Sequence, residues 1–395
     1  MGSRLETDLE KRINPERSRK FSTEDFARRL VHLEEAGAQL WPRKNGIRLA
    51  VVGTNGKGSV SHYLSSMLLR HGQSVGLYTS PHLHHFTERI RINGEAIATH
   101  VLDASYEWLR SRMDPALWSD LSYFELLTLV AIQAFQSSDL QFQIFEAGLG
   151  GRLDATRLCK PEHVIVTRIS LDHTALLGHT REAIFREKVA MVQDSTSDLY
   201  LMDKTFAAAA KKANQCPTLH VFSPTERKAA GQNAATHYLE SNFAFAEWIL
   251  SHILPEAHLH RFEDFPPPPG RMEQKEGHGI RWIYDSGHNP ASLYQVLSEI
   301  QGPMLLILGI LPDRSYRQFL RVAARFGHRT FGLTFPGLAD VPPEIPSLDG
   351  LRPDQCREKV LATCKESGYD TVVITGSHRI HDLFLEILGP SGVHA

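Results

Sequence analysis

Cysteine is scarce in this chain, and the few cysteines lie far apart. Cys159, Cys216, Cys356 and Cys364 form no C-x-x-C pair. This spacing argues against both a disulfide framework and a structural zinc site. The sequence therefore predicts a protein of a reducing compartment, which we expect to be the cytoplasm.

Long apolar runs and an excess of one charge are also missing. The longest strongly apolar stretch, MLLILGIL at 304–311, is far shorter than the roughly 20 residues of a membrane helix. The charged N-terminus lacks the apolar core of a secretory signal. The 43 Lys and Arg residues nearly balance the 45 Asp and Glu residues, so the net charge is −2. We expect a soluble protein with neither a membrane nor a nucleic acid as partner.

Strands and helices alternate along the first two thirds of the chain. The N-terminal 45 residues read as helix, and apolar strands are predicted at 47–52, 74–80, 142–148 and 163–170. Helical patterns at 60–71 and 124–136 fall between them. This order predicts an α/β fold with a doubly wound, mostly parallel sheet.

A run of four prolines, in EDFPPPPGRM at 263–272, interrupts this alternation. Consecutive prolines fit neither a helix nor a central strand, so they read as a semi-rigid connector. The alternation then restarts, with strands expected at 281–287, 303–310, 329–335 and 370–377 and helices at 291–300 and 315–327. We therefore predict domains at 1–262 and 271–395, joined by a linker at 263–270.

The stretch VVGTNGKGSVSHYL at 51–64 resembles a strand, a glycine loop and a helix. Backbone amides of such a loop, next to a helix N-terminus, form an anion site. The common P-loop would need glycine at 51 and a hydroxyl at 58, where Val51 and Gly58 stand. We expect Lys57 to contact outer phosphates and Ser59 to approach a metal, the alternative being an ordinary tight turn.

Polar side chains follow the predicted strands. Ser80, Glu146 and His173 each come at or just after a strand end, where ligands bind in open α/β sheets. Hydroxyl and carboxylate oxygens suit Mg²⁺. A lone histidine is more often structural, but several strand ends meeting at one edge favour a site. The H-x-H-H spacing of His82, His84 and His85 lacks a carboxylate and argues against zinc.

Three further residues are candidates for the site, and two of them, Lys188 and Asp285, also have an ordinary structural interpretation. Lys188 is either a surface lysine or one that reaches into the site. Arg271 could clamp a phosphate. Asp285 could accept a hydrogen bond from a ribose or an amine, but DSGHNPAS is also typical of a turn or a helix cap.

Together these strings resemble one family. GTNGKGS has the general form found in Mur ligases. Other strings are more specific to the folate branch of that superfamily, namely YTSPHL, FTERIRING, EAGLGGRLDAT and LDHTALLGHT followed by REK. The sequence is similar to the folylpolyglutamate synthase/dihydrofolate synthase family of the Mur ligase superfamily, from residue 47 to about 315. The resemblance implies a P-loop-containing Mur ligase central domain and a smaller, Rossmann-like C-terminal α/β domain.

The resemblance also implies an activity. Members use ATP to add L-glutamate to dihydropteroate, or to the γ-carboxylate of folate glutamates, through an acyl phosphate, and they release ADP and phosphate. It implies two Mg²⁺ ions, a carbamylated lysine at Lys188, small-molecule substrates only, and a monomer.

The family's site residues carry over by position. Catalytic roles fall on Lys57, His173 and Lys188, and the metal ligands are Ser80, Glu146, His173 and Lys188. The ATP-binding positions are Gly53, Thr54, Asn55, Gly56, Lys57, Gly58, Ser59, Asn242, Arg271, Asp285 and His288. The acceptor-binding positions are Pro81, His82, Ser122, Tyr123, Phe124, Leu153, Asp154 and Ala155.

Departures from the family pattern leave alternatives open. Arg157 replaces the asparagine that the family usually has. VAM follows REK in place of the usual Ala-Gly-Ile, and the final 80 residues resemble the family least. One alternative is a Mur-type ligase with another acceptor, although too few residues precede Ile47 for a UDP-binding domain. The other is a non-catalytic nucleotide-binding relative, which would tolerate loss of Lys57, Glu146, His173 or Lys188. All four are present.

Overall fold

The computed structural model describes residues 4–18, 23–41, 46–213, 218–223, 237–327 and 329–389. The chain divides into two compact units, Met1–Phe265 and Pro266–Ala395. The boundary lies inside the expected linker, because Phe265 still belongs to the first unit. Its side chain is buried, and its ring centroid lies 5.4 Å from that of Phe243.

A mostly parallel sheet forms the centre of the first unit. Among the described residues it has eight strands in the order β4-β3-β2-β5-β1-β6-β7-β8. The β3 strand runs antiparallel to β2 and to β4, and the other pairs are parallel. The strands are β1 (Ile47–Val52), β2 (Val75–Tyr78), β3 (Ile90–Ile92), β4 (Glu95–Ala96), β5 (Phe142–Glu146), β6 (His163–Val166), β7 (Asp198–Leu201) and β8 (Thr218–Val221).

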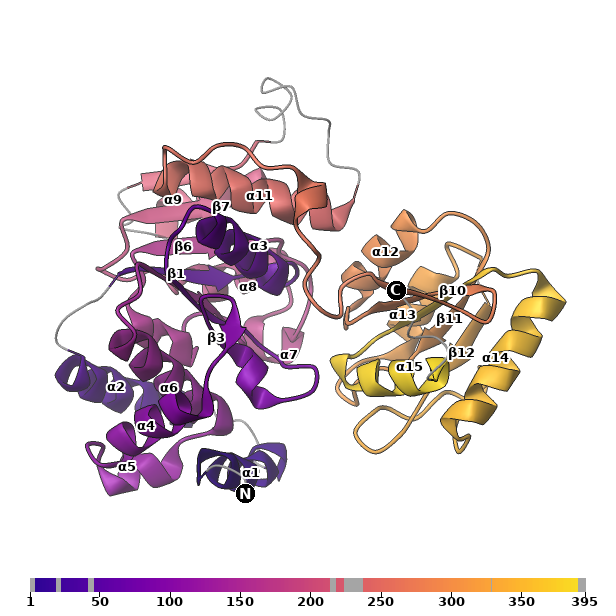
Figure 1. Cartoon of the computed structure of the whole chain (residues 1–395), viewed down its shortest axis with the longest axis horizontal. Helices are drawn as coiled ribbons and strands as arrows, with labels where there is room; N and C mark the ends of the chain where they lie inside the picture. The colour runs from indigo at the N-terminus through magenta and orange to yellow at the C-terminus, as the bar shows by residue number, and fades with distance from the viewer. Residues whose placement is uncertain are drawn as a thin grey trace. The chain divides into compact units, whose positions relative to one another are not determined.

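Helices cover both faces of this sheet. Along β1, Leu49 and Val51 pack in a core with α3 and α11, which lie side by side (Figure 1). Ala50 and Val52 point to the opposite face, toward residues of α8 and α9, and α6 covers Phe145 on that face. The helices are α1 (Arg4–Ser18), α2 (Thr23–Leu40), α3 (Lys57–Arg70), α4 (Thr99–Arg110), α5 (Pro115–Asp120), α6 (Tyr123–Ser137), α7 (Thr174–Leu177), α8 (Arg181–Val189), α9 (Ala207–Ala213) and α11 (Tyr238–Ile253).

The second unit has its own sheet and core. The described strands follow the order β12-β11-β13-β10-β9, parallel except for the antiparallel pair β9 and β10. Trp282 and Ile307 are buried against Val360 and Phe384 of two of its helices. The elements are β9 (Glu273–Gly277), β10 (Ile280–Asp285), α12 (Pro290–Glu299), β11 (Met304–Leu308), α13 (Tyr316–Ala323), β12 (Arg329–Gly332), α14 (Pro353–Ser367), β13 (Thr371–Thr375) and α15 (His381–Leu388).

The predicted α/β class is confirmed, and each predicted strand overlaps an observed one. The predicted N-terminal helix is two helices, α1 and α2, as far as the chain is described there. Within the described ranges, no helix combines the length and the apolar character needed to cross a bilayer. Cys159, Cys356 and Cys364 are buried and unbridged, whereas Cys216 lies outside the described residues.

Candidate active site

The glycine loop between β1 and α3 is closely packed. Gly53 (φ +153°) and Gly56 (φ +89°) have backbone conformations that L side chains rarely adopt. A Cβ on Gly53 would lie 1.9 Å from Thr167 Oγ1. The Thr54 amide donates to Arg168 O at 2.8 Å. No side chain caps α3 at Gly56, so the N-terminal amides of the helix can serve as donors to an anion.

Two lysines bring positive charge to this loop. The Lys57 side chain bends back over it, with Nζ 3.4 Å from Thr54 O. Lys188, on α8, is only 4% exposed. Burial and then the charge of Lys57 lower the pKa of Lys188 to about 7, against the opposing effect of Asp172 and Asp154. The buried amine is therefore partly neutral near pH 7.

Glu146 lies against the loop from the end of β5. Its buried carboxylate accepts a hydrogen bond from the Ser80 amide at 3.0 Å. Its Oε2 is 3.4 Å from the position that a Cβ on Gly58 would take. A buried carboxylate beside a serine and a phosphate-type loop suits a hard divalent cation. The structure thus brings together Ser80 and Glu146, the predicted ligands of the first metal.

Asp172 and His173 follow β6. The Asp172 side chain is buried, and its Oδ1 accepts from the His173 amide at 2.8 Å. His173 has a left-handed backbone (φ +46°), which is uncommon outside glycine. Its ring is about one third exposed, with Nε2 3.9 Å from Asp172 Oδ1. A partly exposed imidazole held by a buried carboxylate can serve as a ligand.

The side-chain oxygen of Asn242, on α11, points to a ligand at the glycine loop. The residue is almost fully buried, and its Oδ1 has no hydrogen-bond partner among the described residues. That oxygen lies 2.7 Å from where a Cβ on Gly56 would be. An unsatisfied buried amide oxygen is costly, and a nucleotide at the loop could supply a donor to it.

The GLGG turn after β5 is wedged between two helices. A Cβ on Gly148 would lie 2.9 Å from the Phe124 ring, and one on Gly151 would lie 2.3 Å from Lys188 O. Asp154 holds the turn in place, because its buried carboxylate accepts from the Leu149 amide at 2.8 Å. Burial raises the pKa of Asp154. The turn thus fixes the end of α8 that carries Lys188.

Some predicted acceptor-binding residues already have partners within the protein. His82 Nδ1 accepts from Arg89 Nε at 2.9 Å, and burial together with Arg89 lowers the pKa of His82 to about 4. The Arg89 guanidinium also lies 5.3 Å from the Tyr123 ring centroid. Sequence reasoning missed Arg89, although it lies within the FTERIRING string.

Ser122 starts α6 and borders a cavity. Its hydroxyl accepts from the Glu125 amide at 3.2 Å in a capping box. The cavity lies between α2 and α5 and has a volume of about 830 Å³. Of the remaining predicted positions, Leu153 packs at the core edge and Ala155 is buried. Pro81 follows Ser80 through a cis peptide bond.

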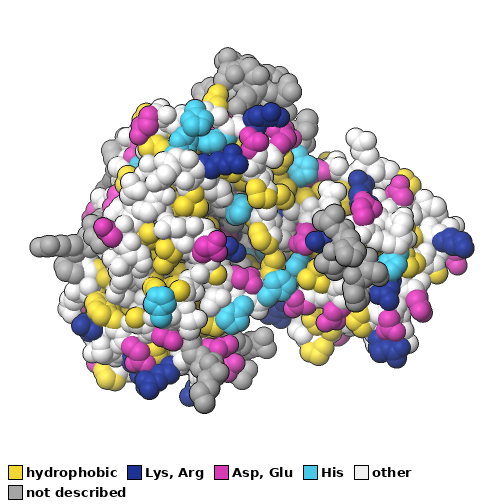
Figure 2. All heavy atoms as spheres, viewed as in Figure 1, with side chains coloured by type: hydrophobic (Ala, Val, Ile, Leu, Met, Phe, Trp, Pro, Cys, Tyr) yellow, Lys and Arg dark blue, Asp and Glu magenta, His cyan; other side chains and the backbone are white. Residues whose placement is uncertain are grey.

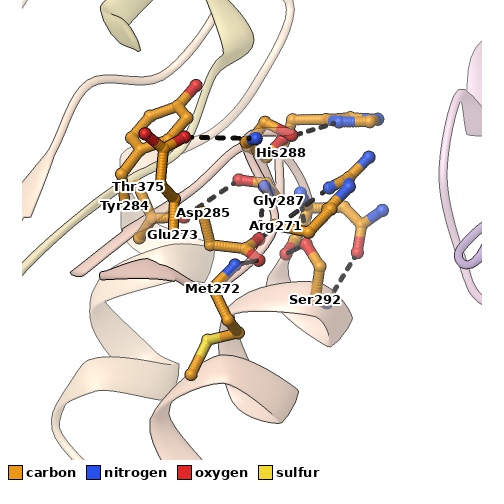
Figure 3. Close-up of polar contacts among 12 residues, drawn as sticks. Arg271, Met272, Glu273, Tyr284, Asp285, Gly287, His288, Ser292 and Thr375 are labelled. Carbon is orange, nitrogen blue, oxygen red and sulfur yellow. Dashed lines mark hydrogen bonds and ion pairs between the residues drawn. The ribbon is translucent and has the colours of Figure 1, made fainter. Parts of the chain in front are cut away.

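In the second unit, Asp285 organises the turn after β10 (Figure 3). Its buried carboxylate accepts from the Met272 amide at 3.1 Å and from the Gly287 amide at 2.8 Å. Arg271 Nη1 lies 3.8 Å away. The helix-cap interpretation of Asp285 is wrong, because Asn289 caps α12 by accepting from the Ser292 amide at 2.9 Å.

The parallel sheet, the glycine loop and the two lysines define a nucleotide-binding α/β protein. The model of the Mur ligase middle domain matches residues 51–255. A dihydrofolate synthase/folylpolyglutamate synthase of Escherichia coli (strain K12) is 43% identical over 301 residues, covering 67% of this chain and 67% of that relative. Across the first curated relatives that it matches, the chain spans between 32% and 73% of their length.

Solved structures agree with this match. A bifunctional folylpolyglutamate synthase/dihydrofolate synthase with Mn, AMPPNP and L-glutamate bound is 25% identical, with TM-score 0.69 and coverage of 91% of this chain and 94% of that chain. The E. coli protein in complex with DHPP and ADP shares the fold, at 24% identity, TM-score 0.68 and 96% coverage of both chains. The chain belongs to the dihydrofolate synthase/folylpolyglutamate synthase family and contains a Mur ligase middle domain.

Proposed function

We propose that the chain joins L-glutamate to the carboxylate of dihydropteroate, of a folate glutamate, or of both, and releases ADP and phosphate. The observation that carries this proposal is the grouping of Lys57, Lys188 and Glu146 around one glycine loop. A lysine amine at the loop, a second, buried lysine and a metal-type carboxylate at a phosphate site suit phosphoryl transfer between anions. The relatives' names, and the AMPPNP and L-glutamate of one structural neighbour, support the same reaction.

The chemistry has two steps. A carboxylate oxygen of the acceptor attacks the γ-phosphorus of ATP, the bond from that phosphorus to the β–γ bridging oxygen breaks, and ADP leaves. The α-amine of glutamate then attacks the acyl carbon of the resulting acyl phosphate, loses a proton and expels phosphate. Lys57 neutralises charge on the transferring phosphoryl group. Arg271 and Asp285 would contribute to ATP binding.

Divalent metal ions fit the residues present. Ser80 and Glu146 would hold one ion, and His173 with a modified Lys188 would hold a second. When bound, such ions neutralise phosphate charge during transfer. Mn in the structural neighbour supports a divalent metal at this type of site.

We also propose that Lys188 carries a carbamate. Carbamylation needs a neutral amine, and the pKa of about 7 at Lys188 supplies one near neutral pH. The product is an anion with two oxygens, which suits a hard metal better than an ammonium group does. Wild type should show a carbamate signal by ¹³C NMR in ¹³C-bicarbonate and lose activity when bicarbonate is stripped. If the activity of wild type does not depend on bicarbonate and Lys188→Ala keeps full activity, the carbamate proposal is wrong. The rest of the proposed function would still stand.

The acceptor is tested by measuring ADP release with L-glutamate and one acceptor at a time. Dihydropteroate and tetrahydrofolate are the two expected acceptors, and Ser122 at the edge of the α2–α5 cavity supports the first. Turnover with tetrahydrofolate alone would restrict the chain to polyglutamylation. Turnover only with a UDP-linked peptide would favour another Mur-type ligase. ATP binding without glutamate-dependent turnover would favour a non-catalytic relative.

A further inference from the structure

Three histidines of the first unit meet at the far end of α3. His71 follows the last residue of α3, and His258 and His260 lie in the segment after α11. Each offers a ring nitrogen, and these nitrogens all lie within 4.8 Å of one another. The ring centroids are 4.6 Å apart for His71 and His258 and 5.1 Å apart for His71 and His260. We call these residues the tri-histidine cluster.

Three of the cluster's ring nitrogens are buried and make no hydrogen bond within the described part of the chain. Both ring nitrogens of His260 and Nε2 of His71 are buried without a hydrogen-bond partner among the described residues. The His260 residue is only 8% exposed. Leaving a buried polar group unpaired costs free energy. A ligand that binds imidazole nitrogens would remove this cost at two residues at once.

The surroundings favour a cation that binds neutral imidazole. Burial lowers the pKa of His260 to about 4, and burial with the nearby His258 lowers the pKa of His71. Neutral imidazole is the form that binds metals. The buried Glu247 has Oε1 3.9 Å from His260 Nδ1. A carboxylate behind a histidine is the usual outer support of a metal ligand.

We propose that the tri-histidine cluster binds a divalent transition-metal ion of the zinc class. Neutral imidazoles suit Zn²⁺, whereas Mg²⁺ and Ca²⁺ prefer oxygen ligands. Three protein ligands leave a fourth position for water or an added ligand, and the exposed side chain of His258 leaves solvent access. The site is distinct from the glycine loop, because α3 (Lys57–Arg70) separates them by about 20 Å at 1.5 Å per residue.

The ion would stabilise the end of the first unit. Arg70, next to His71, already donates to Asp264 O at 2.8 Å, and its guanidinium lies 4.3 Å from the Phe265 ring centroid. A metal shared by His71, His258 and His260 would add a second tie between α3 and the segment that ends at Phe265. Metal binding would therefore raise the stability of the folded unit.

The chain has 21 histidines, and Figure 2 shows several on the surface of one face, so the test must separate this cluster from ordinary surface histidines. Zn²⁺ is titrated calorimetrically into metal-free protein in excess Mg²⁺, which keeps oxygen-rich sites filled. We expect one tight equivalent and a rise in Tm with Zn²⁺. His258→Ala, at an exposed position, should weaken that equivalent at least tenfold and abolish the rise. His100→Ala, at an exposed position on α4, is the matched control and should change neither.

A Co²⁺ titration gives a second readout that does not depend on stability. Cobalt bound tetrahedrally by three imidazoles and water should give intense d–d absorption bands in wild type and in His100→Ala, and only the weak absorption of aqueous Co²⁺ in His258→Ala. His71→Ala tests a second proposed ligand and should lose the intense bands as well. Wild type that shows neither a tight Zn²⁺ equivalent nor cobalt bands would overturn the proposal. A tight equivalent that survives His258→Ala would overturn it as well.

Discussion

Lys57 and Lys188 have different proposed functions because they differ in burial. Lys57 sits on the loop with its amine near Thr54 O, where it can meet a phosphate directly. Lys188 is enclosed by its helix, by the GLGG turn and by Asp172 and Asp154, and its pKa falls to about 7. In the proposed function, Lys57 thus meets the phosphate at the loop, and Lys188 offers a reactive neutral amine.

The first prediction concerns Lys57. Lys57→Met should lower kcat by about 10²- to 10³-fold, because a donor aimed at charge in the transition state is lost. Lys211→Met, on an exposed position of α9, is the matched control and should keep wild-type turnover. Steady-state ADP release, with whichever of dihydropteroate and tetrahydrofolate supports turnover in wild type, measures kcat for both variants. Equal kcat in Lys57→Met and wild type would rule out the phosphate role.

The second prediction is the pH dependence of stability due to Lys188. Its folded-state pKa is lowered from 10.5 to about 7, so the unfolded chain binds more protons between these values. Stability therefore rises with pH through this window. Below about pH 7 the folded protein carries the full cost of a buried charge. Lys188→Met should thus stabilise most below pH 7, and its advantage should shrink as the pH rises toward 10.5.

Urea unfolding at several pH values, in buffer free of carbon dioxide, measures this difference between Lys188→Met and wild type. Lys211→Met provides the baseline for removing an exposed lysine. A stability difference for Lys188→Met that stays constant from pH 6 to 10, the range of this titration, would contradict the lowered pKa.

At the scale of elements, α3 has a glycine near each end, and the two differ in what surrounds them. Gly56 (φ +89°) would place a Cβ 2.7 Å from Asn242 Oδ1, whereas Gly72 (φ +72°) has nothing within 4 Å of that position. Both glycines adopt a left-handed backbone. Alanine substitutions at these two glycines therefore separate the cost of backbone strain from the cost of steric contact at the candidate nucleotide site.

The third prediction uses this contrast. Gly72→Ala should cost about 1 kcal/mol of stability from backbone strain alone and leave the KM for ATP unchanged. Gly56→Ala should cost more, and it should also raise the KM for ATP, because the loop and Asn242 must move apart. The free energy of unfolding in urea and the KM for ATP, measured for both variants, test this prediction. Matching effects of the two substitutions would show that the Asn242 contact is unimportant.

The same elements show what the sequence can and cannot reveal. The strand, loop and helix around Lys57 follow from local patterns: an apolar run, glycines and an amphipathic stretch. The Glu146 position follows from parallel strands ending at one edge. The pairing of His82 with Arg89 does not follow, because it depends on the tertiary position of the segment after β2. The tri-histidine cluster joins residues almost 190 positions apart in the sequence, and no local pattern links them.

At the scale of the whole molecule, the alternation of strands and helices along the sequence predicted the two α/β units. It predicted less well the short strands near the edges of the first sheet and the boundary between the units. The edge strands β4 and β8, and β3 next to β4, have only two to four residues, too few to show a period. The first unit extends to Phe265, within the predicted linker, because that aromatic ring packs into the first core directly before the four prolines begin. Tertiary packing, rather than composition, decides where each unit ends.

The last prediction is the oligomeric state, which we expect to be a monomer. Among the described residues the large exposed hydrophobic side chains are Val31, Ile47, Leu171, Leu176, Leu259 and Tyr294. They come from several separate segments of both units, and stable interfaces between subunits normally need a contiguous apolar core. Light scattering after size exclusion should give a mass near 44.4 kDa that does not change with protein concentration. A mass near twice that value, persisting on dilution, would contradict the monomer and would point to an interface built mainly from polar groups.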